Sequence, residues 1–130
     1  MLIERYFEFL QAAVVACPLV QTFRLAYDKR GTYEGFIRGE VHFPDGSTLH
    51  IREFVDTEQG VDRLTYVYQY LDPALNLVFR YDNTGHHRRL GLASYPDHKH
   101  DGSESSVVSS MAPGLADVLR EIQGLITPTT

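Results

Sequence analysis

The chain has 130 residues, of which 43% are hydrophobic, so one domain spanning 1–130 with a real core is expected. Its formal net charge of −5 argues against broad, non-specific binding to nucleic acid, but it leaves room for a small basic site. No apolar run approaches the roughly 20 residues that cross a bilayer, so no membrane association is expected. The single cysteine, Cys17, excludes an internal disulfide, and with a start that lacks a signal peptide it favours a cytoplasmic location.

The spacing of apolar residues along the first two thirds of the chain predicts one helix followed by strands. Residues 2–16 carry an apolar stripe at spacings of three and four, which predicts a helix that ends before Pro18. From residue 20 the period changes to two, which is typical of strands joined by short turns. The segments with this period are 20–29, 33–43, 47–56, 62–71 and 75–82.

The last third of the chain reads differently. Residues 83–110 have no sustained period and are rich in Gly, Pro and Ser, so a long loop is predicted, of the kind that is more often functional than idle. Apolar residues at helical spacing then predict a final helix, with Pro113 at an early helical position. The expected fold class is therefore α+β: a single antiparallel meander sheet of about five strands with the N- and C-terminal helices packed on it.

A group of histidines dominates the predicted loop. Four of the six in the chain, His86, His87, His98 and His100, fall within fifteen residues. Imidazole gives and takes protons near neutral pH, and it is also a common metal ligand. Three interpretations follow from the residue types: acid–base catalysis, a metal site, or a solvated loop that is rich in histidine.

The charged neighbours of these histidines help to weigh the interpretations. Metal-free cleavage of RNA needs a base, an acid and cations that stabilise the phosphorane, and imidazoles with Arg80 and Lys99 supply all three. Asp82 would orient an imidazole, as carboxylates do in catalytic dyads. Metal binding is disfavoured because Lys99, between His98 and His100, would repel a cation.

Two further residues are secondary candidates. Glu53 falls on the apolar face of its predicted strand, where a carboxylate needs a partner, so it is either part of a core ion pair or an active-site acid. We expect Arg80 to be near it, since both project from strands of one sheet. Tyr68 lies between Tyr66 and Tyr70 at period two, in an aromatic ladder that either packs in the sheet or lines a polar cleft.

Several segments resemble the TumE family of toxins. Residues 39–49, 53–56 and 66–70 are similar to the front of that family, and residues 79–87 and 96–100 resemble its pattern FRYDN-x-x-HH followed by P-x-H-K-H. The resemblance implies a growth-inhibiting toxin of a type II toxin–antitoxin system, neutralised by an antitoxin. It gives no mechanism; ribonuclease activity is an inference by analogy with toxins that act on RNA.

The preferred hypothesis is a metal-independent ribonuclease that transfers protons through the histidine cluster. Its candidate residues are Arg80, Asp82, His86, His87, His98, Lys99 and His100, with Glu53 and Tyr68 in second place. No cofactor is expected, although a divalent metal such as zinc stays open. The alternatives are a metal-dependent nuclease and a non-catalytic module that binds a partner or a metal. The expected partners are an antitoxin, RNA as substrate, and a second copy in a homodimer, bound through the first helix or a sheet edge.

Overall fold

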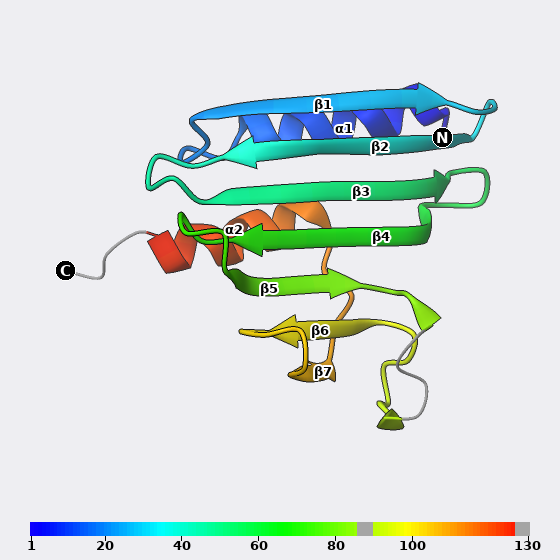
Figure 1. Cartoon of the computed structure of the whole chain (residues 1–130). Helices are drawn as coiled ribbons and strands as arrows, with labels where there is room; N and C mark the ends of the chain where they lie inside the picture. Colours follow the sequence, from blue (N-terminus) through cyan, green and yellow to red (C-terminus); the bar gives the residue numbers. More distant parts are fainter. Residues whose placement is uncertain (86–89, 127–130) are drawn as a thin grey trace.

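The computed structural model describes residues 1–85 and 90–126, and these form an α+β fold. One seven-stranded sheet runs in chain order from β1 to β7, each strand antiparallel to the next (Figure 1). The strands are β1 (Thr22–Lys29), β2 (Glu34–His42), β3 (Thr48–Asp56), β4 (Asp62–Leu71), β5 (Leu77–Asp82), β6 (His98–Asp101) and β7 (Val107–Ser109). The helices are α1 (Ile3–Val15) and α2 (Leu115–Ile126). The expected meander with two terminal helices is confirmed.

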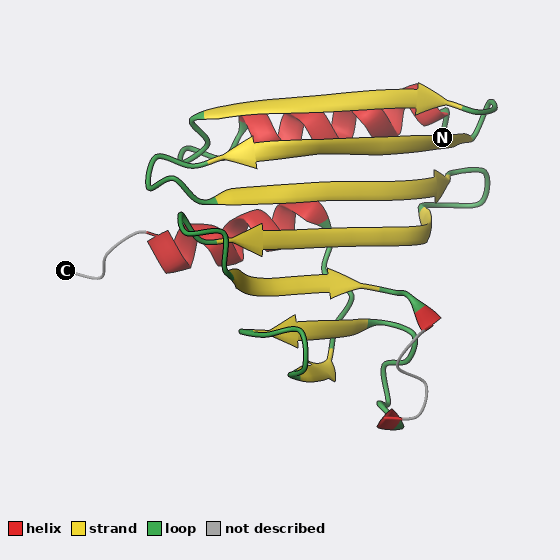
Figure 2. Cartoon of the chain, viewed as in Figure 1, coloured by secondary structure: helices red, strands yellow, loops and turns green. Residues whose placement is uncertain are grey.

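Both helices pack on the same face of the sheet, as Figure 2 shows. Each buries one apolar stripe, which for α1 includes Phe7 and Leu10 and for α2 includes Leu119 and Ile122. Because successive side chains of a strand point to opposite faces, every second residue of the strands meets these stripes. The core therefore lies between the helices and one face of the sheet.

The predicted helix boundaries are close to the observed ones. The first helix begins and ends one residue inside the expected range of 2–16. The second begins at Leu115, two residues after Pro113, so the early helical position expected for Pro113 is wrong. Among the described residues, no helix is long and apolar enough to cross a bilayer.

The number of strands differs from the expected five because the predicted loop at 83–110 contains two more. Strand β6 pairs with β5, and β7 pairs with β6. These strands have only four and three residues, and β6 consists of polar side chains on both faces, so no apolar alternation marks it. The pairing partner, rather than the local sequence, makes this segment a strand. His98 and His100 consequently lie on a sheet, where the chain is rigid, and not in a loop.

The face of the sheet away from the helices, which we call the open face, carries no covering helix in the described part of the chain (Figure 1). The pairing register defines two neighbouring rows of side chains across it. From β1 to β6, one row consists of Arg24, Glu40, His50, Gln69, Arg80 and His100. The other consists of Ala26, Arg38, Arg52, Val67, Asp82 and His98. The open face thus brings arginines from β2 and β3 into line with the histidines of β6.

Candidate functional site

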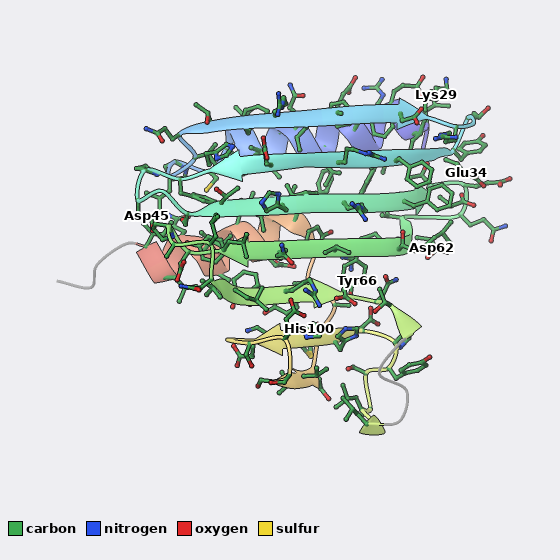
Figure 3. The ribbon with its side chains drawn as sticks, viewed as in Figure 1. Lys29, Glu34, Asp45, Asp62, Tyr66 and His100 are labelled. Carbon is green, nitrogen blue, oxygen red and sulfur yellow. The ribbon has the colours of Figure 1, made fainter. Side chains whose placement is uncertain are left out.

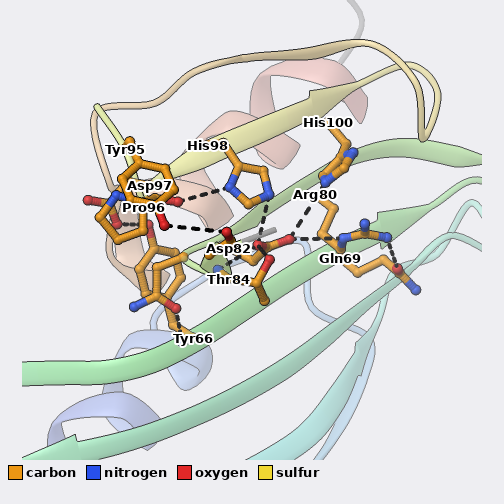
Figure 4. A network of polar contacts seen from close by, with 12 residues as sticks. Tyr66, Gln69, Arg80, Asp82, Thr84, Tyr95, Pro96, Asp97, His98 and His100 are labelled. Atoms are coloured by element: carbon orange, nitrogen blue, oxygen red, sulfur yellow. Dashed lines mark hydrogen bonds and ion pairs between the residues drawn. The ribbon is translucent and has the colours of Figure 1, made fainter. Parts of the chain in front are cut away.

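Three side chains of β5 and β6 meet on the open face, as Figure 4 shows, and we call Asp82, His98 and His100 the Asp–His–His cluster. Asp82 ends β5 and lies directly across the ladder from His98. The Nε2 atom of His98 is 2.9 Å from Oδ1 of Asp82, and Nε2 of His100 is 3.8 Å from Oδ2. Each of the three side chains is at most 4% exposed. Asp82 therefore contacts both imidazoles, and its role in orienting one of them for catalysis stays a prediction.

The outer nitrogen of each ring is held by the backbone. Nδ1 of His98 lies 2.9 Å from the carbonyl oxygen of Pro96, and Nδ1 of His100 lies 2.8 Å from that of Glu104. A carbonyl oxygen only accepts, so both Nδ1 atoms carry a hydrogen and donate it. In a neutral ring the lone pair is then on Nε2, which points at Asp82. The backbone therefore selects the tautomer that turns both lone pairs toward one carboxylate.

Further hydrogen bonds fix that carboxylate. The backbone N–H and the hydroxyl of Thr84 both donate to Oδ1 of Asp82 at 3.0 Å, and Nε of Arg80 donates to Oδ2 at 3.1 Å. The remaining nitrogens of Arg80 donate to the Glu104 carboxylate at 2.5 and 2.7 Å, which raises the pKa of the guanidinium. The Arg80 guanidinium, which was expected to stabilise a phosphorane, is therefore bound by Glu104 in this structure.

A groove lies beside the cluster on the open face, with a volume of about 570 Å³. Figure 3 shows His100 on β6, on the same side of the sheet as the stick side chains of the preceding strands that face the viewer. The charged groups at the groove are the arginines 24, 38 and 52, with Glu40 as the acid among its lining residues. Arg38 and Arg52 lie directly opposite each other on β2 and β3, where like charges destabilise a sheet. The groove therefore concentrates positive charge in a chain of net charge −5.

Comparison with known proteins adds the family. The model of the family described as toxin TumE matches residues 8–126. The chain belongs to the TumE toxin family. The match covers the sheet, the cluster and α2, so the resemblance inferred from short segments is confirmed over nearly the whole chain. No curated protein and no solved structure gives a match.

Lys99 of this TumE-family toxin lies on the helix-covered face, between the two histidines in sequence but not in space. Its Nζ is 3.2 Å from Oε2 of Glu121 in α2 and 5.1 Å from the centroid of the Tyr81 ring. Alternation along β6 turns it away from the imidazoles. The structure thus removes both expectations about Lys99, that it would hold a phosphate beside the histidines and that it would repel a metal from them.

Glu53 and Tyr68 also face the helices, inside the core. The hydroxyl of Tyr6 donates to Oε1 of Glu53 at 2.5 Å, and the hydroxyl of Tyr68 donates to Oε2. Arg63 completes the network by donating to the Tyr68 hydroxyl at 3.1 Å. The expected proximity of Glu53 and Arg80 is wrong, because Arg80 pairs with Gln69 on the open face. The network ties α1 to the sheet.

This buried network makes the stability of the TumE-family toxin depend on pH. Burial raises the pKa of Glu53, although the tyrosine hydrogen bonds and Arg63 oppose it. An acid with a raised folded-state pKa contributes stability that is fully present below its unfolded pKa, about 4.3 for glutamate, and is lost as pH rises through the folded-state pKa. Urea unfolding of wild type and Glu53→Gln is measured between pH 4 and 8. The free energy of unfolding of the wild type is expected to fall as pH rises, and that of Glu53→Gln is expected not to show this fall.

The variant Glu53→Ala distinguishes the effect of Glu53 ionisation from the effect of losing its buried hydrogen bonds. Glu53→Ala is expected to lower the free energy of unfolding by about 3 kcal/mol at pH 4, where the carboxyl group contributes most, since it leaves two buried hydroxyls without their acceptor. If Glu53→Gln and the wild type follow the same pH profile, ionisation of Glu53 does not contribute to the stability of the fold.

The sequence-based site was incomplete in identifiable ways. His86 and His87 lie outside the described residues. Thr84, which holds Asp82, was missed although it had a local signal, since an Asp side chain often accepts from the residue two positions later. Glu104, which holds Arg80, was missed because it lies 24 residues away in sequence and only the folding of β6 against β5 brings it to the site. The Arg38–Arg52 pair had a signal in the sequence, since each arginine alternates with apolar residues in its predicted strand, yet their direct opposition required the register.

Proposed function

We propose that this TumE-family toxin cleaves RNA, and that the RNA lies across the open face of the sheet. The observation that carries the proposal is the direct opposition of Arg38 and Arg52 on neighbouring strands. Such a like-charge pair costs about 0.2–1 kcal/mol, which a polyanion bound between the two guanidinium groups would offset. Arg24 adds a third cation to the same groove.

The position of this arginine pair relative to the Asp–His–His cluster supports the same substrate. Arg52 and Asp82 occupy one row of the sheet and are separated by Val67. Two strand spacings amount to about 10 Å. With one phosphate of an RNA chain at the cluster, a phosphate further along the same chain would lie over the arginines. An RNA chain that crosses the strands along this row would contact the Asp–His–His cluster and the arginine pair at the same time.

The cluster offers the chemistry that phosphodiester cleavage needs. The 2′-hydroxyl must lose a proton, the leaving oxygen must gain one, and the charge of the phosphorane must be stabilised. The ring centroids of His98 and His100 are 5.0 Å apart, so one phosphate would lie within reach of both imidazoles. Asp82 would hold the orientation of His98. This is the metal-independent form of the proposal, which the residue types favour.

A metal-dependent nuclease is the second candidate, and the burial of both imidazoles favours it. Each ring is only 2% exposed. A metal ion bound by the two rings would therefore reach the RNA more readily than the rings themselves. The sequence-based argument against a metal relied on Lys99, whose ammonium lies on the other face with Glu121. Both forms place the reaction at the same three residues.

Family membership suggests an antitoxin partner, and we propose that the antitoxin neutralises this chain by binding it. The outer strand β1 has one unpaired edge among the described residues, and α1 exposes Phe9 at 60%. An unpaired strand edge and an exposed aromatic side chain each suit a protein partner, either the antitoxin or a second copy of the chain. Co-expression with the protein encoded by the neighbouring gene is expected to restore growth and to yield a stable complex.

The function is tested with purified chain and matched oligonucleotides. RNA and DNA of one sequence are incubated with the protein, with divalent metal in one series and chelator in the other. Cleavage of the RNA alone is expected, because only RNA supplies the 2′-hydroxyl nucleophile. The proposal is overturned if the chain arrests growth but cuts RNA in neither series.

Substrate binding is tested through its salt dependence. Arg38→Gln and Arg52→Gln are each expected to weaken RNA binding and to reduce the slope of log K against log salt by about 0.7, the value for one lost phosphate contact to a single strand. Arg5→Gln is the control, since Arg5 is a 73% exposed arginine on α1, which packs on the opposite face of the sheet. An equal effect in all three variants would show that RNA does not use the open face.

A further inference from the structure

We infer that the Asp–His–His cluster binds a divalent transition-metal cation, with the Asp82 carboxylate and the Nε2 atoms of His98 and His100 as its ligands. The inference rests on the ligand geometry and holds whether or not RNA is the substrate. The three ligand atoms lie within 4.8 Å of one another. The distances from the Asp82 oxygens to the Nε2 atoms of His98 and His100, 2.9 and 3.8 Å, lie on either side of the roughly 3.3 Å between ligand atoms of a tetrahedral zinc site.

The hydrogen bonds around the cluster are those that prepare metal ligands. A metal-bound imidazole usually donates its other N–H to a carbonyl or carboxylate, which fixes the tautomer and the ring orientation. His98 and His100 both do so, to Pro96 and Glu104. The carboxylate is likewise held, by the N–H and hydroxyl of Thr84. All three ligands are therefore oriented before an ion arrives.

The charges around the cluster also admit a cation. Within residues 1–85 and 90–126, Arg80 is the nearest fixed positive charge, 3.1 Å from Asp82, and its guanidinium is bound by the Glu104 carboxylate on its other side. Two carboxylates thus face one guanidinium. Lys99 pairs with Glu121 beyond the sheet. Counting the charges of the described residues, a bound dication would meet a site with an excess of negative charge.

The ligand types narrow the class of ion. Two imidazoles and one carboxylate suit zinc and its first-row neighbours, whereas magnesium and calcium prefer oxygen ligands throughout. Three protein ligands leave a further coordination position for water or substrate, which distinguishes catalytic zinc sites from closed structural ones. If the proposed function holds, that position is where a phosphate oxygen of the RNA would bind.

The test measures the ion directly. Full-length chain is stripped with chelator, titrated with Zn²⁺ by calorimetry, desalted and analysed for zinc. One ion per chain is expected, together with a higher Tm in Zn²⁺. His98→Ala and His100→Ala are each expected to weaken binding by more than about 100-fold, because even loss of an outer-shell partner costs about 10–100-fold.

Two controls and one conservative variant complete the design. Lys99→Gln changes the residue between the two ligands but on the other face, and His42→Ala removes a histidine whose side chain is 43% exposed; both are expected to keep wild-type affinity. Asp82→Asn, which keeps the size of the side chain, is expected to lose affinity and serves if an alanine variant does not fold, as judged by circular dichroism.

The outcomes separate this inference from the proposed function. The 2.9 Å contact between His98 and Asp82 would equally suit an Asp–His hydrogen bond in a chain that binds no zinc. The metal site is overturned if the wild-type chain binds no zinc. It is also overturned if folded variants of His98, His100 or Asp82 bind zinc with wild-type affinity. RNA cleavage that persists in chelator together with zero stoichiometry leaves the proposed function standing alone. Zinc binding without cleavage leaves the metal site standing alone.

Discussion

Replacing His98 or His100 by alanine is expected to lower the rate of RNA cleavage by about 10²–10⁴-fold and to relieve growth arrest. The magnitude is that of one lost proton-transfer group, and loss of a metal ligand would be at least as severe. Both rings contact the same carboxylate, so the double variant is expected to lose little more than either single one. Single-turnover cleavage of a labelled RNA measures the effect, with growth after induction as the second readout.

The control for this prediction is His42→Ala, which removes a histidine from the end of β2, away from the cluster. It is expected to cleave RNA at the wild-type rate. Because the cluster is buried, each variant must also be shown to be folded by its urea unfolding transition. Folded His98→Ala and His100→Ala proteins that cleave at the wild-type rate would place the activity elsewhere in the chain.

Gly39→Ala is expected to lower the free energy of unfolding by about 3 kcal/mol, at the upper end of what overpacking costs. A Cβ at this position in β2 would lie 2.1 Å from the backbone oxygen of Arg24 and 2.8 Å from Cδ2 of Leu25. The first contact involves backbone and is relieved only if the β1–β2 ladder moves. Urea unfolding of wild type and variant, with the slope m compared, measures the change.

Gly124→Ala provides the matched control for the glycine substitution. Gly124 lies in α2 with nothing within 4 Å of an added Cβ, so alanine is expected to stabilise the chain by about 1 kcal/mol through helix propensity. The two glycine variants should therefore shift the urea midpoint in opposite directions. A Gly39→Ala protein with the wild-type midpoint would mean that β1 and β2 pair in a different register.

The sequence by itself determined the fold class, both helices and the first five strands. The reason is that these segments bury apolar side chains at a fixed period, which local sequence records directly. It also determined the family, because the motifs at 79–87 and 96–100 are specific. Asp82 and the paired histidines of residues 98–100 were identified from their chemistry alone, and the structure brings them together.

Only the tertiary structure decided which face each residue of the site occupies. Strand β6 has no apolar pattern of its own, and its pairing with β5 turns His98 and His100 toward Asp82 while it sends Lys99 to Glu121. Glu53 on β3 and Arg80 on β5 belong to one sheet, yet their side chains face opposite sides of it. Side chains alternate along each strand, and the pairing register determines which residues share a face. Pairing between strands is a long-range interaction, so the chemistry of residues 98–100 is set by β5 and not by their own sequence.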